Sequence, residues 1–532
     1  MSDRTKAGSP FSSRIGGIMS GLSPKSLKTR TKGDDLSSAL SSLQIGDAGL
    51  PTLSEDDRRK LSDPKVTRLA RVTQMYFLEY YFDLLNYIKA RRGRYAKMHQ
   101  VTLPGMAEAE RPLALRSYYG RERALLRKRR TKLHYGDFDI LTQVGQGGYG
   151  QVYLARKRDS KEVCALKVLS KKLLIKLDEI GHIMTERDIL TQASQSEWLV
   201  KLLYSFQDPD NLYLAMEFVP GGDFRTLLNN TGTLNARHTR FYMSEMFLAL
   251  DALHQLNFIH RDLKPENFLI TAEGHIKLTD FGLAAGKISD HRIESLRKRL
   301  DEAKQFNVPY LSVKQRQDAY RTARMAEIDY ASSVVGSPDY MALEVLQGHN
   351  YDYTIDYWSM GCMLFEALVG YPPFSGRSSE ETYANLQNWK KALRRPQYEN
   401  GEYVFSDRTW DLIQRLITSQ RYRLRSFSEV SSHAYFADVD WANIKDQRPP
   451  FIPDLDGEDD AGYFDDFDNE ADMAKYKEVL NKRAHVEGLA DRGNLSSRDF
   501  IGFTFRHAKP VASDIPGTLR GGLATEPFST IL

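Results

Sequence analysis

The amino-terminal third of the chain contains a segment whose polar positions form a helical stripe. Residues 75–88 are apolar except at Glu79, Asp83 and Asn86, which follow each other at i, i+4 and i+7. This spacing places the three polar side chains on one narrow face of a helix. Because a helix that is apolar around most of its circumference needs partners on several sides, the pattern predicts a helix that packs against another structure.

The pattern changes to strands at residue 138. Residues 138–144, 151–156 and 163–168 alternate apolar and polar positions or run apolar with β-branched side chains, which predicts three strands. After Asp178 the pattern becomes mostly helical and continues so to about residue 436. Together these patterns predict an α+β domain with strands first and helices afterwards.

The two ends of the chain have polar compositions. Residues 1–54 contain twelve Ser and seven Gly, so this segment has little apolar surface to bury and is predicted to be disordered. Residues 454–474 contain ten acidic side chains and no Lys or Arg, which indicates an extended tail. No apolar run of about 18 residues occurs, so we expect no membrane span, and the start has no apolar region typical of a signal peptide. The two cysteines exclude a disulfide framework.

Charge is nearly balanced over the whole chain but not locally. The net charge is +4, whereas residues 89–132 carry fourteen Lys or Arg against three Glu. In this segment Arg116, Arg123, Arg127 and Arg130 share one helical face, and Gly120 interrupts the pattern, which weakens the case for a continuous helix. Such a charge attracts the phosphates of nucleic acids or an acidic protein surface. Apolar stripes beside the arginines, and the lack of a base-reading motif, favour the protein partner.

A glycine-rich loop and a lysine follow the first predicted strand. Residues 145–150 match G-x-G-x-x-G, and a strand rather than a helix comes next, which favours a flap over phosphates and not a dinucleotide site. Lys167 lies in a strand that resembles V-A-I-K, and Glu186 follows in a helical run. A lysine between apolar residues needs a defined acceptor, such as ATP phosphates or a carboxylate.

The most specific motif lies in the middle of the chain. Residues 260–267 match H-R-D-L-x-x-x-N at every fixed position, and D-F-G follows at residues 280–282. With these motifs in order, residues 138–436 resemble a eukaryotic Ser/Thr protein kinase domain. The resemblance implies a bilobal α+β fold, with a β-rich small lobe and a helical large lobe, and ATP and Mg²⁺ as cofactors. It implies these catalytic residues: Asp262 as base, Lys264 beside the transferred phosphoryl group, Lys167 on the ATP phosphates, Glu186 as its partner, and Asn267 and Asp280 as metal ligands.

The hinge sequence narrows the resemblance to the AGC group of kinases. Residues 216–223 resemble the AGC hinge, in which Asp223 contacts ribose and a basic substrate residue, and Glu266 matches a second acid that meets substrate arginine. The resemblance therefore implies protein substrates with basic residues before the acceptor. It assigns the following residues to ATP binding: Val144, Gly145, Gly147, Gly148, Gly150, Val152, Lys167, Glu217 and Asp223.

The activation segment is unusually long. Asp280 to Glu344 spans 65 residues, and its insert at residues 287–324 carries ten Lys or Arg and five acids. This basic insert resembles that of the NDR/LATS kinases, and we expect it to restrain activity by competing with basic substrates. The motif A-P-E is replaced by A-L-E, whose Glu344 is expected to pair with Arg423. The resemblance makes Ser333 an activating phosphosite.

The carboxy-terminal region resembles the AGC tail. Phe500, Phe503, Thr504 and Phe505 match the hydrophobic motif, in which Thr504 is a second phosphosite and the aromatics dock on the small lobe beside the helix of Glu186. The tail, the A-L-E variant and the basic region together resemble fungal mitotic-exit and septation kinases of the NDR/LATS family. This implies roles in mitotic exit, septation and cytokinesis. It also implies an upstream activating kinase and a Mob-family coactivator bound by residues 70–132. The implied location is the cytoplasm, the spindle pole and the division site, and partly the nucleus.

The chain is thus divided into five predicted regions: a disordered tail (1–62), a basic helical coactivator-binding region (63–133), the kinase domain (138–436), the AGC extension (437–508) and a flexible tail (509–532). The alternative function is a pseudokinase scaffold that binds ATP without turnover. Pseudokinases usually lack one of the catalytic residues, and none is missing here.

Overall fold

A computed structural model of the chain describes four long stretches of residues, 63–130, 132–284, 311–326 and 338–467. Shorter described parts are residues 55–56, 59, 297–298, 300–302, 469, 473, 476, 481, 500 and 503–506. The chain divides into residues 1–67, of which few are described, and one compact unit from Arg68 to Leu532. The predicted tail at residues 1–54 and the flexible tail at residues 509–532 lie outside the described residues.

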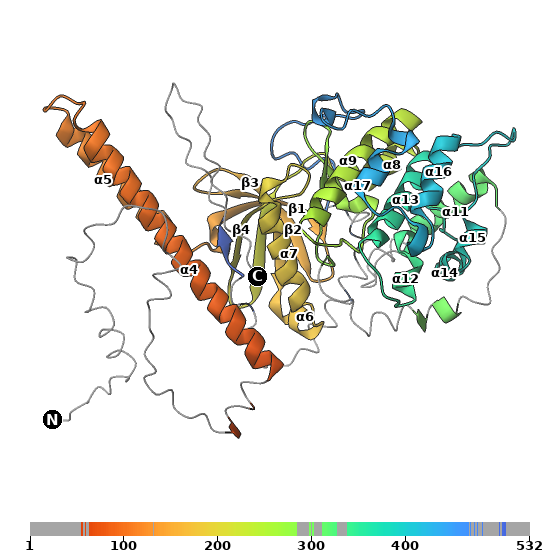
Figure 1. Cartoon of the computed structure of the whole chain (residues 1–532), viewed down its shortest axis with the longest axis horizontal. Coiled ribbons are helices and arrows are strands. Elements are labelled where there is room, and N and C mark those ends of the chain that lie inside the picture. Colours follow the sequence, from red (N-terminus) through yellow and green to blue (C-terminus); the bar gives the residue numbers. More distant parts are fainter. Residues whose placement is uncertain are drawn as a thin grey trace. The chain divides into compact units, whose positions relative to one another are not determined.

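Two long helices precede the sheet. Helix α4 (Pro64–Lys97) and helix α5 (Arg111–Arg130) are separated by the short π-helix η2 (Met98–Thr102) (Figure 1). The Arg94 guanidinium of α4 donates to the Glu122 carboxylate of α5 at 2.5 Å, and the Glu122 side chain is buried. The predicted helix at residues 75–88 is confirmed. The helix is continuous at Gly120 although this glycine interrupts the sequence pattern, because α5 runs through it.

The small lobe is a six-stranded sheet with the order β1-β2-β3-β5-β4-β8. Its strands are β1 (Phe138–Gln146), β2 (Gly150–Lys157), β3 (Val163–Ser170), β4 (Leu202–Gln207), β5 (Asn211–Glu217) and β8 (Phe505–Arg506). All neighbouring pairs are antiparallel. The three predicted strands are confirmed. The mostly helical interpretation after Asp178 missed β4 and β5, and also β6 (Phe268–Ile270) and β7 (Ile276–Leu278), which form a second, two-stranded sheet.

Side chains of β3 alternate between the two faces of the six-stranded sheet. Cys164 and Leu166 join a small apolar cluster with Phe138 and Phe206. Ala165 instead packs against the large core, and Lys167, two positions further, points to the same side because strand side chains repeat every second residue. The alternation therefore places Lys167 on the face of the sheet that packs against the large core. The small-lobe helices are α6 (Lys171–Lys176) and α7 (Ile180–Gln192).

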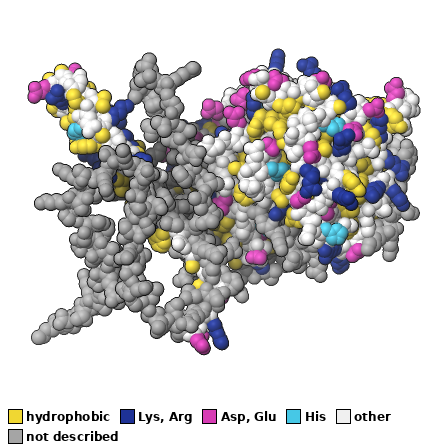
Figure 2. All heavy atoms as spheres, in the orientation of Figure 1, with side chains coloured by type: hydrophobic (Ala, Val, Ile, Leu, Met, Phe, Trp, Pro, Cys, Tyr) yellow, Lys and Arg dark blue, Asp and Glu magenta, His cyan; other side chains and the backbone are white. Residues whose placement is uncertain are grey.

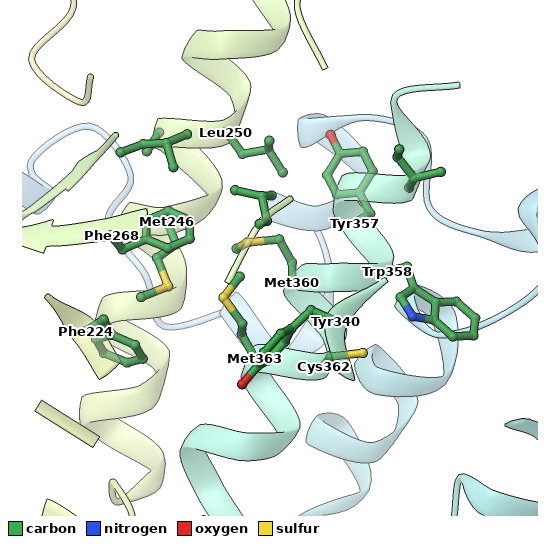
Figure 3. Close-up of a cluster of buried hydrophobic side chains, with 14 of the residues drawn as sticks. Phe224, Met246, Leu250, Phe268, Tyr340, Tyr357, Trp358, Met360, Cys362 and Met363 are labelled. Atoms are coloured by element: carbon green, nitrogen blue, oxygen red, sulfur yellow. The ribbon is translucent and has the colours of Figure 1, made fainter. Parts of the chain in front are cut away.

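The large lobe is helical and has a continuous apolar core. Its helices are α8 (Phe224–Thr231), α9 (Ala236–Gln255), α12 (Leu343–Leu346), α13 (Thr354–Val369), α14 (Ser379–Gln387), α15 (Trp389–Ala392), α16 (Asp407–Leu416) and α17 (Phe427–Ser431). Helix α13 is buried on nearly all sides: Figure 3 shows its Met363 on the side that faces Met246 of α9, whereas its Trp358 lies on the other side and stacks on Phe374. Such a central helix gives the neighbouring loops a rigid support.

Short 3-10 helices connect the longer elements. They are η3 (Tyr135–Asp137), η4 (Ala193–Gln195), η5 (Pro265–Asn267), η8 (Pro338–Tyr340), η9 (Gln420–Tyr422), η10 (Ala434–Phe436) and η11 (Ile444–Asp446). The insert in the activation segment contributes helix α11 (Val313–Ala326). Helix α11 packs on the large lobe: Arg316 donates to the carbonyl of Pro373 at 2.7 Å, and Gln317 donates to the carbonyl of Val369 at 2.8 Å.

Candidate active site

The lysine, the glutamate and the aspartate that the motifs single out meet beside the sheet. The ammonium of Lys167 donates to the Glu186 carboxylate at 2.7 Å and lies 3.7 Å from the Asp280 carboxylate. Helix α7 buries Ile183, Glu186 and Ile189 on one face, so Glu186 points toward the sheet and only 2% of its side chain is exposed. The helix is therefore in the position that closes the ion pair.

Electrostatics favour the charged form of this lysine. Burial works against the charge, but the carboxylates of Glu186 and Asp280 outweigh it and raise the pKa of Lys167 well above its ordinary value. Desolvation would raise the pKa of Asp280, whereas Lys167 and Lys264 lower it below its ordinary range. At neutral pH the site therefore holds an ammonium and an ionised aspartate side by side.

The catalytic loop is fixed from below by Asp356 at the start of α13. Its two carboxylate oxygens accept the backbone N–H groups of His260 at 2.9 Å and Arg261 at 2.8 Å. Asp356 is fully buried, and Arg261 has a positive φ of 69° that few side chains tolerate. Because charged hydrogen bonds are strong in a buried setting, Asp356 sets the path of the loop just before Asp262.

Asp262 and Lys264 lie within ion-pair distance of each other. The Lys264 ammonium is 3.2 Å from the Asp262 carboxylate, which is the main cause of a raised pKa for Lys264. The Asp262 carboxylate thus lies directly next to a cation. A hydroxyl placed at this carboxylate would find both a base and a positive charge.

Two oxygen donors near this loop suit a hard divalent cation. Asn267 is 2% exposed, and its side-chain oxygen is buried without a hydrogen-bond partner among the described residues. Asp280 is ionised because of its lysine neighbours, as described above. A buried, unsatisfied amide oxygen is costly unless another group binds it, and carboxylate and amide oxygens are ligands that Mg²⁺ prefers. The residues present therefore fit a divalent metal.

The glycine-rich loop joins β1 and β2 above this site. At Gly150 a Cβ atom would lie 1.8 Å from the carbonyl oxygen of Val168, so only glycine allows β2 to approach β3 so closely. Gly147 and Gly148 are exposed, and Gly145 pairs with Val152 in the ladder. Val144 and Val152 are half-buried. The loop is thus built as a flap whose backbone is accessible.

The hinge follows β5. The Glu217 carboxylate accepts hydrogen bonds from the Lys277 ammonium at 2.7 Å and from the backbone N–H of Lys201 at 2.9 Å, so it is already used within the fold. Asp223 caps α8 by accepting the backbone N–H of Thr226 at 2.7 Å. Burial raises the pKa of Asp223 to about 6.

The second predicted substrate acid has a partner that the sequence did not reveal. Glu266 accepts from the guanidinium of Arg225 at 3.1 Å. Arg225 also donates to Glu366 and to the hydroxyl of Tyr340. No motif signals this cluster, because its members are up to 141 residues apart along the chain.

The end of the activation segment is held as expected. The Arg423 guanidinium donates to Glu344 at 2.7 Å, and the Arg423 side chain is fully buried, which confirms the predicted pair. The A-L-E variant therefore keeps the ion pair without the proline. The predicted phosphosite Ser333 lies outside the described residues.

The carboxy-terminal tail returns to the small lobe. Phe500 and Phe503 are buried in the large core, which also includes Ile183 and Ile189 of α7. The Ser205 hydroxyl donates to the carbonyl of Phe503 at 2.5 Å. Strand β8, which contains Phe505, extends the sheet beside β4, and Figure 1 shows it at this edge. Thr504 is exposed between these buried groups. The tail thus docks on the small lobe as expected, with Phe503 and Phe505 at β4 and the Phe500 ring under the Lys171 ammonium.

A lysine–glutamate ion pair beside a glycine-rich loop, with Asp262, Asn267 and Asp280 nearby, is the arrangement expected of a phosphotransferase of the protein kinase class. The family model described as "Protein kinase domain" matches residues 138–309 and 312–436, and the model "Protein kinase C terminal domain" matches residues 455–505. The chain belongs to the protein kinase family, in its AGC group, and is of the NDR/LATS type.

Curated relatives agree with this assignment over most of the chain. Serine/threonine-protein kinase DBF20 of Saccharomyces cerevisiae is 54% identical over 90% of this chain and 86% of its own length. Cell cycle protein kinase DBF2 of the same yeast is 56% identical over 88% of this chain and 82% of its length. Serine/threonine-protein kinase sid2 of Schizosaccharomyces pombe is 52% identical over 91% of this chain and 80% of its length.

The protein is accordingly a Ser/Thr protein kinase that uses ATP and a divalent metal and acts on protein substrates. The comparisons give no support to the pseudokinase alternative. Among the described residues, no helix is long and apolar enough to cross a membrane.

Proposed function

We propose that Asp262 is the catalytic base and that Mg²⁺ is the divalent ion held by Asn267 and Asp280. The ion and the nucleotide supply charge neutralisation and the phosphoryl group when they are bound. Asp262 orients the substrate hydroxyl and takes its proton. Lys264, which lies beside it, offsets the negative charge that develops during transfer. Lys167, kept in place by Glu186, holds the α and β phosphates.

The observation that carries this proposal is the Lys167–Glu186 bond at 2.7 Å next to Asp280. The test is transfer of radiolabelled phosphate from Mg²⁺-ATP to a Ser peptide. Because base and charge stabilisation supply most of the catalysis, Asp262→Ala is expected to lower kcat by about 10²–10⁴-fold. Undiminished turnover in this variant, with contaminating kinases excluded by Lys167→Met, would refute the assignment.

We further propose that substrates carry Arg or Lys before the acceptor, with Arg three residues before it preferred. Asp223 carries this proposal. Within the described part of the chain it forms no ion pair, and it caps a helix directly after the hinge. The sequence also assigns Glu266 to this role, but its carboxylate already accepts a hydrogen bond from Arg225. Asp223→Asn is expected to raise KM for an Arg peptide more than for its Ala version.

The α4–α5 hairpin is proposed to bind a Mob-family coactivator. Its exposed apolar side chains include Phe77 (53% exposed), Tyr81 (56%) and Leu85 (60%), which is unusual for helices in water. Arg116 and Arg123 are exposed on α5. Figure 2 shows hydrophobic side chains together with Lys and Arg on this hairpin. An acidic partner with an apolar groove suits both features.

The coactivator proposal is tested by charge reversal. Arg116, Arg123 and Arg127 replaced together by Glu should abolish binding of a purified Mob protein and slow its association at low salt. A matched control reverses Arg237, an exposed arginine of α9. Equal pull-down of the Mob protein by the triple variant and the control would contradict the proposal.

We propose that the kinase acts in mitotic exit, septation and cytokinesis, after phosphorylation at Ser333 and Thr504, with an upstream kinase as activator. Arg261 is the cation proposed to receive the Ser333 phosphate. The names of the relatives, which include a cell cycle protein kinase, support this role. The proposed locations are the cytoplasm, the spindle pole, the division site and in part the nucleus. The decisive observation is a block in septation when Asp262→Ala replaces the native enzyme.

A further inference from the structure

Arg225 is a buried cation at the start of α8. Arg225 is 5% exposed, and its guanidinium donates four hydrogen bonds to three other elements of the fold. Nε donates to Glu266 of the catalytic loop at 3.1 Å. Nη1 and Nη2 donate to the two oxygens of Glu366 on α13 at 2.5 and 3.2 Å. Nη2 also donates to the hydroxyl of Tyr340, at the end of the activation segment.

The two acids that Arg225 binds are unequal in their surroundings. The side chain of Glu366 is 1% exposed, so its charge needs a partner inside the protein. The side chain of Glu266 is 31% exposed and belongs to η5, four residues after the catalytic Asp262. The acid pair therefore extends from the interior to the surface next to the place of the substrate hydroxyl.

This arrangement has the chemistry of a receptor for arginine. Two carboxylates and a tyrosine hydroxyl surround a planar guanidinium that they bind through a bidentate pair and two further bonds. A pair of carboxylates near the catalytic loop would also bind a basic residue of a substrate. Here the cation comes from the chain itself, and the guanidinium of a substrate cannot occupy the same place.

The insert in the activation segment reinforces the cluster. Tyr320 of α11 donates its hydroxyl to Glu366 at 3.0 Å, and its residue is 7% exposed. Glu366 thus accepts bonds from α8, η8 and α11, which fixes Arg225 in a network rather than at a mobile surface.

We propose that Arg225 is a specificity-determining residue. Its guanidinium binds both carboxylates of the acid pair Glu266–Glu366 and thereby prevents this pair from binding a second basic residue of the substrate. The enzyme then selects one basic residue through Asp223 alone. This inference rests on the proposed preference for basic substrates.

The test is an arginine scan with purified full-length kinase. The parent peptide carries Arg three residues before Ser, and each further peptide adds one Arg at another position on the amino-terminal side of the acceptor. In the wild type, a second Arg is expected to change kcat/KM by less than about twofold, whereas in Arg225→Met one position should gain about tenfold, mainly through KM. Glu266→Gln in the Arg225→Met background should remove the gain.

Two controls separate this role from a merely structural one. Arg225→Lys keeps a cation in the cluster and should keep the selectivity of the wild type. Arg237→Met removes an exposed arginine from α9 and should leave the scan unaltered. A structural role alone predicts that Arg225→Met lowers kcat equally on all peptides and creates no new preference, and this result would overturn the proposal.

A second variant decides the question if Arg225→Met does not fold. Because Glu266 is already engaged, Glu266→Gln in the wild type should change the ratio of kcat/KM between the parent peptide and its Ala version by less than about twofold. A loss of about tenfold in this ratio would show that Glu266 binds the substrate base, and the proposal would fall. If instead the wild type does not prefer the parent peptide at all, the failure lies with the proposed role of Asp223.

Discussion

Replacing Phe503 with alanine removes the most deeply buried side chain among the described residues of the tail. Phe503 is 0% exposed and shares the core with Ile183 and Ile189 of α7, the helix that carries Glu186. Truncation of a buried Phe costs about 3–5 kcal/mol. Because the sheet has a further apolar cluster that contains no tail residue, we expect this loss to undock the tail and not to unfold the domain. The docking equilibrium should shift by about 10²–10⁴-fold.

Undocking has two measurable consequences. Without the tail, α7 loses packing on one side and the Lys167–Glu186 pair opens more often, so kcat should fall strongly. The edge of the sheet also becomes free, because β8 pairs with Tyr204 and Ser205 of β4. Hydrogen exchange of the β4 amides should therefore rise, while the main thermal transition stays in place.

The control for this experiment is Tyr422→Ala, which removes an aromatic side chain that is 71% exposed on the large lobe. It should change neither kcat nor the exchange of β4. The reasoning is refuted if Phe503→Ala keeps wild-type kcat although β4 exchange has risen, because tail docking and activity would then be independent. It is also refuted if β4 exchange does not change.

Four further outcomes are expected. Thr504→Ala should lower kcat with little change in thermal stability, measured with the coactivator present, since Thr504 is exposed and its role is proposed to be phosphorylation. Burial raises the pKa of Asp223 to about 6, so this acid is half ionised near that pH. The kcat/KM preference for Arg over Ala peptides should therefore be full well above pH 6 and should be lost as the pH falls through this value. Replacing the Lys and Arg of the insert at residues 287–324 by Ala should raise basal peptide phosphorylation. Arg316 is kept in this variant, because it stacks on Tyr371 and donates to a carbonyl of the large lobe. Unchanged or lower basal activity would indicate that the insert has a structural role instead. Arg316→Ala alone should instead lower the melting temperature, because the half-buried guanidinium packs on the Tyr371 ring and donates to the carbonyl of Pro373.

The local pattern of the chain was sufficient for β1, β2 and β3 but not for β4 and β5. The first three strands lie on either side of the glycine-rich loop and contain β-branched residues, so their alternation of apolar and polar positions can be recognised in the sequence. Strand β5 is buried on both faces between β3 and β4, and its apolar run therefore lacks alternation. A short apolar run of this kind is compatible with a helix or a strand, and only pairing with neighbours decides between them.

The sequence by itself determined the chemistry of the site. Asp262, Asn267 and Asp280 are recognisable because phosphoryl transfer requires these side chains at fixed spacings in two continuous loops. Only the tertiary structure revealed that Arg225 donates a hydrogen bond to the Glu266 carboxylate. The two residues are 41 positions apart, and no local sequence rule links them. The sequence thus identifies the groups that can react. The tertiary structure determines which charged groups pair with each other inside the protein and which remain available to bind a substrate.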